Sequence, residues 1–369
     1  MKVSFVNYSK QHAKYPEIEE AILRVARSND RILRGEVQKF EENLAKFVGT
    51  KYAVGCANGT DALTMSLRAL GVGKGDEVIT VGHTFHATVE AIVHNGATPV
   101  LVDVGEDGMM DVFAVEKAIT QKTKAIIPVH LMGDMADIWY LRDMCGSKIH
   151  LVEDACQALG ATRYWDNQLG RRAGATGITG AFSFFPAKIL GCYGDGGAVT
   201  TNDENLYNEL KNMREHYKYS DTPKYGFNSR LDELQAAILN VKFKYLPDML
   251  KRRQEIADIY DKELSKIEVH AYPDDLGFYN PLILPTKRQG RVYQDYIIRT
   301  DRRNELAQFL KENGIETLKN DYHFPADLPK PEGTVLLESQ TLRLPCNDVL
   351  EDEEVLYVIE KIKEFYDKK

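Results

Sequence analysis

The sequence predicts an α/β protein with a large domain on a mainly parallel, mixed β-sheet and a smaller C-terminal α+β domain. Between about residues 36 and 200, short apolar runs rich in β-branched residues alternate with amphipathic stretches of helical period. Such alternation is typical of βαβ units, in which helices cover both faces of the sheet. After Asp203 the pattern changes, so we predict domains at 1–250 and 251–369, divided near the end of a long helix.

Each predicted element of the first domain follows from a local pattern. Apolar, β-branched runs predict strands, and apolar residues recurring every three or four positions predict helices. Asp103, His130 and Asp154 lie at the ends of predicted strands, where ligands of open parallel sheets bind. We expect strands at 52–54, 77–81, 98–102, 124–128 and 149–152, and helices at 60–71, 86–95, 111–119 and 137–146.

The C-terminal part of the chain has a different order of elements. Residues 203–217 and 230–263 show helical patterns, and the second is predicted as one long helix. Beyond residue 265, strands mix with helices at 302–314 and 350–366. Pro and Gly residues concentrate between 273 and 290, which interrupts the earlier alternation and indicates a second domain.

Composition and charge exclude several classes of protein. The chain has 369 residues, 43% hydrophobic and 28% charged, as expected for a globular protein with a sizeable core. A formal charge of −8 argues against nucleic acid as the main partner. No run approaches the roughly 18–20 apolar residues of a membrane span or resembles a secretory signal, so we expect a cytoplasmic protein. The five cysteines are odd in number and form no Cys-x-x-Cys pair, so neither disulfides nor a metal site is expected.

Lys188 is the most informative residue for function. It follows aromatic residues at 184–185 and precedes a glycine-rich turn at 194–197, a setting that indicates a buried lysine. Burial favours the neutral amine, which can form a Schiff base with an aldehyde. Asp154 ends an apolar strand, and a carboxylate there is the partner that a pyridinium nitrogen requires, although helix capping is the alternative. Together the two residues predict pyridoxal phosphate as the cofactor.

Candidate phosphate ligands occur in two places. Gly59 and Thr60 open a helix after a strand, where free N–H groups and a hydroxyl could hold a phosphate. A plain helix cap explains the same residues equally well. Ser183 carries a hydroxyl on an otherwise aromatic strand, and a phosphate is one partner that would satisfy it.

Other candidates also have ordinary alternatives. Phe85 follows a strand and could stack on a flat ring, but a core residue is the simpler interpretation. Gln157 could face the same ligand as the acidic strand end or form a capping box with it. Asn228 and Arg230 could reach an anionic ligand, whereas the serine and aspartate beside them could simply start the next helix.

Taken together and in their order along the chain, these motifs resemble those of the DegT/DnrJ/EryC1/StrS family of sugar aminotransferases. The resemblance runs from about residue 12 to the end of the sequence. The resemblance implies the type I, aspartate aminotransferase-like fold of pyridoxal phosphate enzymes. The stretches that carry it are Gly35-Glu36-Val37 with Phe40-Glu41, Asn58-Gly59-Thr60-Asp61-Ala62-Leu63, Val152-Glu153-Asp154-Ala155-Cys156-Gln157, Phe182-Ser183-Phe184 to Lys188, Gly194-Asp195-Gly196-Gly197-Ala198-Val199 and Asn228-Ser229-Arg230-Leu231-Asp232.

The resemblance also implies a role for each candidate. Lys188 would form the Schiff base, Asp154 would pair with the pyridinium nitrogen, and Gln157 would bond the phenolic oxygen of the cofactor. Phe85 would stack on the ring, and Asn228 would reach in from the second subunit of a homodimer with shared active sites. The phosphate would be held by Gly59, Thr60 and Ser183, and the candidate substrate contacts are Arg230 and His323.

The implied reaction is a transamination. L-glutamate would give its amino group to the cofactor, and a nucleotide-linked ketosugar would then receive it as an aminosugar. The sequence at 228–232 resembles enzymes that act on 3-keto sugars, and amination at C4 is the alternative. The segments 216–219 and 322–327 depart from the usual family pattern beside the sugar site, so the sugar is expected to be unusual.

Two other functions within the family are weighed against this one. Dehydratase relatives replace the lysine with histidine or add cysteines for an iron–sulfur cluster, and neither change occurs here. A pyridoxal phosphate-binding regulatory protein without turnover stays open, because such proteins can retain the lysine.

Overall fold

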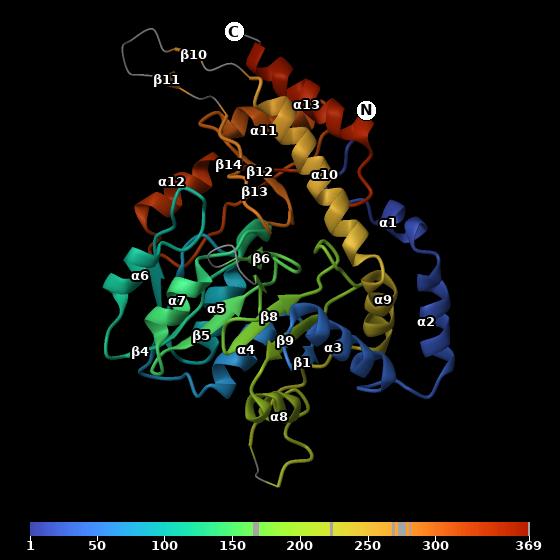
Figure 1. Ribbon diagram of the computed structural model, residues 1–369, viewed down its shortest axis with the longest axis vertical. Coiled ribbons are helices and arrows are strands. Elements are labelled where there is room, and N and C mark those ends of the chain that lie inside the picture. Colours follow the sequence, from blue (N-terminus) through green and yellow to red (C-terminus); the bar gives the residue numbers. More distant parts are fainter. Residues whose placement is uncertain (165–169, 222–223, 268–269, 272–277, 280–281, 368–369) are drawn as a thin grey trace.

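The computed structural model describes residues 1–164, 170–221, 224–267, 270–271, 278–279 and 282–367, and within them seven strands form one sheet (Figure 1). Their order is β1-β9-β8-β5-β4-β2-β3; β9 is antiparallel to β1 and β8, and the other neighbours are parallel. The predicted mixed, mainly parallel sheet is therefore confirmed. The strands are β1 Tyr52–Cys56, β2 Glu77–Val81, β3 Thr98–Val102, β4 Thr123–Ile126, β5 His150–Asp154, β8 Thr179–Ser183 and β9 Gly197–Thr201.

Helices cover both faces of this sheet, as the alternating pattern predicts. Leu151 and Val152 are successive residues of β5, and their side chains pack into different hydrophobic clusters because strand residues alternate in direction. Leu151 joins the cluster that contains α3, α6 and α7, and Val152 joins that of α4, α5 and α8. These helices are α3 Gly35–Val48, α4 Gly59–Ala69, α5 His86–His94, α6 Val112–Ala118, α7 Ile138–Cys145 and α8 Glu204–Met213.

The prediction of one long helix at 230–263 is wrong. The structure has two helices, α9 Glu233–Phe243 and α10 Leu246–Leu264. Pro247 lies in the first turn of α10. In a continuous helix it would remove one hydrogen bond, and its ring would collide with the carbonyl of residue 243. The chain therefore turns at residues 244–245 and starts a new helix.

A second hydrophobic cluster lies above the sheet and is built mainly from residues after 256 (Figure 1). Val3, at the other end of the chain, belongs to it and forms a β-bridge with Ile315. The division near residue 250 stays a prediction, and this separate cluster supports it. Its elements include β12 Tyr296–Arg299, α11 Arg303–Glu312, β13 Leu318–Lys319, β14 Thr341–Leu344 and α13 Asp352–Asp367.

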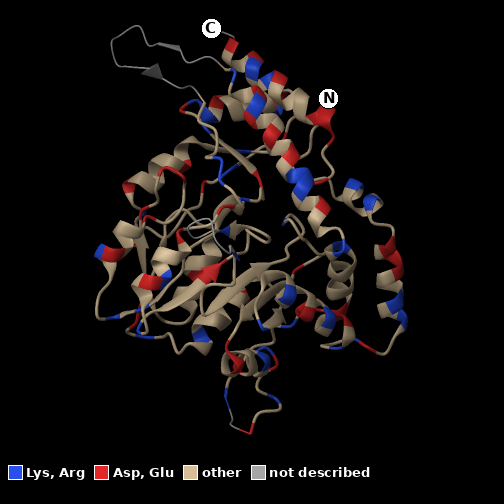
Figure 2. Ribbon diagram, viewed as in Figure 1, with Lys and Arg blue, Asp and Glu red and all other residues tan. Residues whose placement is uncertain are grey.

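Charged residues concentrate on the outer helices and loops, whereas most of the sheet is free of them (Figure 2). None of the helices in the described ranges is long and apolar enough to cross a membrane. The remaining elements are α1 Tyr8–Lys14, α2 Glu17–Arg27, the short 3-10 helix η1 Leu131–Gly133, β6 Thr162–Arg163, β7 Arg171–Arg172, β10 His270–Ala271, β11 Phe278–Tyr279 and α12 Glu332–Gln340.

Candidate active site

The carboxyl ends of the parallel strands β2, β4, β5 and β8 meet at a cavity of about 730 Å³. This is the place where open parallel sheets bind ligands. Seven of the candidate residues taken from the sequence line this one cavity, although they span 130 positions of the chain. They are Gly59, Thr60, Phe85, Asp154, Gln157, Ser183 and Lys188.

Lys188 follows β8 in a tight turn, in which its N–H donates to Phe185 O at 2.8 Å. The side-chain amide of Gln294 holds both neighbours of the lysine. It donates from Nε2 to Ala187 O at 2.8 Å, and its Oε1 accepts from Ile189 N at 3.0 Å. Burial is the main cause that lowers the pKa of the Lys188 amine, against the opposing effects of Cys156 and Asp154. Lys188 is partly buried rather than fully buried, and its lowered pKa agrees with the weakened hold on the proton that the sequence predicts.

Asp154 ends β5 and is held by two donors. Thr88 Oγ1 donates to Asp154 Oδ2 at 2.8 Å, and the N–H of Cys156 donates to Oδ1 at 3.2 Å. Thr88 in turn lies 2.7 Å from the hydroxyl of Thr84, and both threonines are fully buried. The carboxylate is therefore fixed in orientation, with room in its coordination for one more donor from the cavity.

The neighbouring residue Glu153 points to the opposite face of the sheet and has a structural role. Its carboxylate accepts from His130 Nε2 at 2.9 Å and from the N–H groups of Gly174, Thr176 and Gly177 at 2.9, 2.7 and 2.6 Å. Burial alone would raise the pKa of Glu153, but these donors outweigh it and lower the pKa. The two adjacent carboxylates therefore have different roles: Asp154 faces the cavity, and Glu153 fixes the loop at 174–177.

The turn that opens α4 has the geometry of a phosphate site. Asn58 caps the helix by accepting from Asp61 N at 2.8 Å, which leaves the N–H groups of Gly59 and Thr60 without an acceptor in the helix. A Cβ at Gly59 would lie 2.9 Å from both Cys156 Sγ and Ser183 Cβ. Glycine is therefore required here by close packing.

Gln157 and Phe85 occupy the remaining sides of the cavity. Gln157 Oε1 accepts from Met132 N at 3.0 Å. This bond orients the amide so that its Nε2 donor points away from the Met132 backbone. The capping-box interpretation of Gln157 is not needed. Phe85 is 54% exposed, so the core interpretation of this residue is wrong, and its ring packs edge-on against Tyr322.

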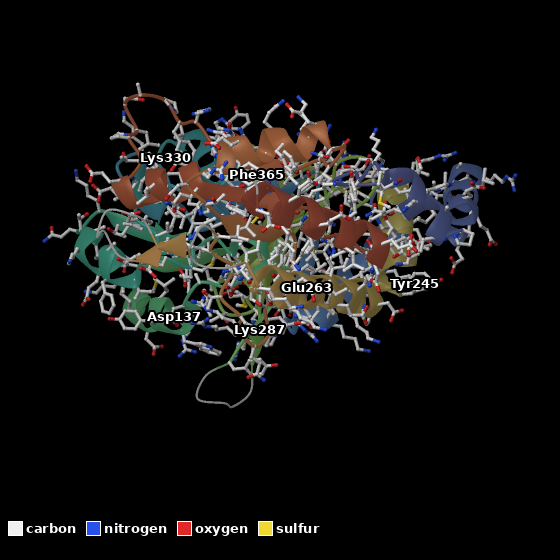
Figure 3. All side chains as sticks on the ribbon, turned by 90° about the horizontal axis from the view of Figure 1, so that it is seen from above. Asp137, Tyr245, Glu263, Lys287, Lys330 and Phe365 are labelled. Carbon is white, nitrogen blue, oxygen red and sulfur yellow. The ribbon has the colours of Figure 1, made fainter. Side chains whose placement is uncertain are left out.

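Four of the residues singled out from the sequence do not line this cavity: Asn228, Arg230, His323 and Asp103. Asn228 is exposed and accepts a hydrogen bond from Arg230, whose Nη1 also pairs with both oxygens of Glu215 at 3.0 and 2.9 Å. His323 lies in a neighbouring hollow beside Lys330, which is labelled in Figure 3. The preceding residue, Tyr322, reaches the cavity instead. Asp103, at the end of β3, accepts from Gly333 N and Thr334 Oγ1 at 3.0 and 2.9 Å and so anchors α12.

Sequence patterns missed three residues that complete the site: Thr88, Gln294 and Arg343. Thr88 lies three residues after Phe85, and no local signal assigns its hydroxyl to a carboxylate 66 positions away. Gln294 and Arg343 lie beside members of the second hydrophobic cluster in the sequence, and no local motif marks them.

Comparison with known proteins identifies the family. A family model described as the DegT/DnrJ/EryC1/StrS aminotransferase family matches residues 13–363. This chain belongs to that family. It is 40% identical to the pleiotropic regulatory protein of Geobacillus stearothermophilus, with 99% of each chain covered. It is also 40% identical to the dTDP-3-amino-3,4,6-trideoxy-alpha-D-glucose transaminase of Streptomyces venezuelae, covering 95% of this chain and 92% of that one.

The fold comparison agrees with the sequence comparison. The crystal structure of S. venezuelae DesV in complex with a ketimine intermediate superimposes on this aminotransferase with a TM-score of 0.90. The two are 37% identical, and the match covers 100% of this chain and 99% of that one. The predicted type I fold, the family and the pyridoxal phosphate dependence are thereby confirmed, and the chain is an aminotransferase.

The residues present in the cavity fit this cofactor. The close-packed Gly59 turn with its free N–H groups suits the phosphate, and the Asp154 carboxylate suits the ring nitrogen. The Gln157 amide has a donor to offer to the phenolic oxygen, and Lys188 has the weakly basic amine that a covalent link requires.

Proposed function

We propose that this aminotransferase moves an amino group from L-glutamate to carbon 3 of a nucleotide-linked ketosugar. The observation that carries the proposal is the convergence of Lys188, Asp154 and Gln157 on one cavity. The similarity to a transaminase named for a dTDP-linked 3-amino sugar supplies the substrate class.

The residues have separate roles in this proposal. Bound pyridoxal phosphate supplies the electron sink that lets a C–H bond beside the transferred nitrogen ionise. Lys188 Nζ would take this proton and return it to the carbon on the other side of that nitrogen, which requires a neutral amine, and the lowered pKa supports that state. Asp154 keeps the ring nitrogen protonated, and Gln157 Nε2 donates to the phenolic oxygen. Gly59, Thr60 and Ser183 hold the phosphate, and Phe85 covers the ring.

Amination at C3 is favoured over C4 by two sequence similarities. The sequence Asn-Ser-Arg-Leu-Asp at 228–232 resembles the 3-keto branch of the family, and the S. venezuelae relative is named for a 3-amino sugar.

We also propose a homodimer in which the partner subunit's Asn228 completes the cofactor site. Within one chain Asn228 is exposed and lies outside the cavity that holds Lys188, as expected for a residue that serves a neighbouring copy. Arg230, held beside it by Glu215, would reach the same neighbouring site and contact the sugar. His323, next to the cavity-lining Tyr322, stays a candidate contact for the sugar.

A regulatory function without turnover is the second candidate. The observation that favours it is the 40% identity to a pleiotropic regulatory protein over nearly the full length of both chains. The presence of Lys188, Asp154 and Gln157 in one cavity favours the enzyme.

The visible absorption of the purified protein with pyridoxal phosphate tests this proposal, with wild type and Lys188→Ala compared before and after addition of glutamate. In wild type, glutamate should convert the cofactor to its amino form and a suitable ketosugar should reverse the change, while Lys188→Ala should respond to neither. Product NMR should then place nitrogen on C3; nitrogen on C4 would overturn that assignment. A cofactor that binds but ignores every amino donor and ketosugar would favour the regulatory function.

A further inference from the structure

Arg343 is a cation in the active-site cavity that the cofactor-binding residues leave without a role. It lies on β14, in the second hydrophobic cluster, and its side chain is 15% exposed. It lines the same cavity as Lys188 and lies close enough for its charge to contribute to the lowered pKa of the lysine, after the larger effect of burial.

The guanidinium of Arg343 is rigidly held by Asp295, whose side chain is only 3% exposed. Nε donates to Asp295 Oδ2 at 3.0 Å, and Nη2 donates to the same oxygen. The ring of Phe5 lies below, 5.5 Å from Arg343 Cζ. Among the described residues, Nη1 has no hydrogen-bond partner, so this side of the guanidinium is available to a ligand.

Arg343 and Lys188 are positioned by adjacent residues of one segment. Asp295 holds the arginine, and Gln294 holds the backbone on both sides of the lysine. The distance between the reacting amine and the guanidinium is therefore set by two neighbouring side chains. This is the arrangement needed to hold a molecule that has an amine or carbonyl at one point and an anion a few bonds away.

We propose that Arg343, through Nη1, binds a carboxylate of the substrate while the substrate reacts beside Lys188. Arginine recognises carboxylates by charge-assisted hydrogen bonds, and a pre-fixed guanidinium loses little freedom when it does so. An amino acid donor carries such a carboxylate next to its amine, and a uronic-acid ketosugar would carry one on its ring. The amino donor is favoured, and the choice between the two sources rests on the proposed function.

The alternative is that Arg343 only balances the charge of Asp295 within the fold. Removing the arginine alone would leave a buried carboxylate unpaired and could unfold the protein. The decisive variant is therefore the double replacement Arg343→Gln with Asp295→Asn, which removes both charges. Arg343→Lys tests for partial rescue, and Arg299→Gln, on the adjacent strand β12 and outside this cavity, is the matched control.

Binding of glutarate, a dicarboxylate that lacks an amine, is measured by calorimetry on the protein loaded with pyridoxal phosphate. We expect the double variant to bind glutarate about 10- to 100-fold more weakly than wild type, because one charge-assisted hydrogen bond is lost. Arg343→Lys should recover part of the affinity, and Arg299→Gln should match wild type. Unchanged affinity in the folded, cofactor-loaded double variant, or no glutarate binding by wild type, would overturn the proposal.

Kinetics separate the two sources of the carboxylate. A raised KM for L-glutamate with an unchanged kcat identifies the amino donor, whereas an effect confined to the ketosugar half-reaction, with competition by free glucuronate, identifies the sugar. The glutarate measurement does not depend on turnover. Arginine-dependent binding in a protein that transfers no amine would support the carboxylate site and reject the proposed function.

Discussion

Thr88 Oγ1 donates a 2.8 Å hydrogen bond to Asp154 Oδ2, and the Thr84 hydroxyl lies 2.7 Å behind it. Since the Thr88 proton is directed to the carboxylate, the Thr88 oxygen accepts from Thr84, and the three groups form a chain. All three side chains are buried, so water cannot replace a lost link. The orientation of the Asp154 carboxylate, which we propose pairs with the cofactor, is thus set by helix α5 as well as by its own strand.

Replacing Thr88 with Val should weaken pyridoxal phosphate binding about 10-fold, which corresponds to about 1.4 kcal/mol for one hydrogen bond to a charged group. Titration of the cofactor-free protein with pyridoxal phosphate measures the change. Thr88→Ser keeps the donor and should stay within threefold of wild type. Equal affinities for the Val and Ser variants would show that the hydroxyl does not support Asp154.

Gly59→Ala should reduce cofactor affinity more than it reduces stability. The added methyl would lie 2.9 Å from Cys156 Sγ and Ser183 Cβ, so the phosphate turn must shift to admit it. We expect at least a 10-fold weaker Kd for pyridoxal phosphate by the same titration. Gly35→Ala is the matched control at the first residue of α3, where a Cβ meets nothing within 4 Å, and it should be neutral or slightly stabilising.

Ser229 ties the phosphate turn to a distant segment, and its loss should loosen that turn. Its hydroxyl donates to Asp61 Oδ2 at 2.6 Å and accepts from Ala57 N at 3.1 Å, and the residue is fully buried. Ser229→Ala should lower the free energy of unfolding by about 1–3 kcal/mol, as for other buried groups left unpaired. Urea unfolding measures this, and the exposed Ser265→Ala should change stability by less than about 0.5 kcal/mol. Matching curves for the two variants would contradict the prediction.

Glu338 should make stability fall as the pH rises from about 4.5 to 7. Burial raises the pKa of this carboxyl to about 7, although its ion pair with Lys330 at 2.5 Å opposes the shift, and Asp321 and Arg303 also act on it. Because the folded state binds the proton more tightly than the unfolded state in this window, deprotonation destabilises the folded state.

The measurement is the midpoint of thermal unfolding between pH 4.5 and 7.5 for wild type and Glu338→Gln. As the pH rises across this window, the midpoint of wild type should fall relative to that of Glu338→Gln. The exposed Glu353→Gln should follow wild type at every pH. A constant difference between wild type and Glu338→Gln would contradict the raised pKa.

Sequence patterns predicted those parts of the site that depend on local structure. Asp154 ends a strand, Gly59 and Lys188 each follow one within a few residues, and strand ends of a parallel sheet meet at one edge. Their convergence therefore follows once the βαβ alternation is recognised. The family resemblance added the roles, which spacing alone does not supply.

The rest depends on contacts between distant segments. The bond from Gln294 to Ala187 joins residues 107 positions apart, and that from Ser229 to Asp61 joins residues 168 apart. No periodicity or motif encodes such pairs, because they form only when segments far apart in the sequence pack together. The break between α9 and α10 is different, because Pro247 is a local signal in the sequence, and a prediction from helical periodicity alone runs through it.

The pairing of Val3 with Ile315 constrains how the upper cluster can move relative to the sheet. The backbone of Val3 exchanges 2.9 Å hydrogen bonds with Gly314 and Glu316, and the side chain is fully buried. The chain therefore crosses between the two clusters at its beginning as well as through α10 (Figure 1). The part of the chain that brings Arg343 and Gln294 to the cavity is therefore joined to the sheet at both of its ends, by the Val3 backbone and by α10.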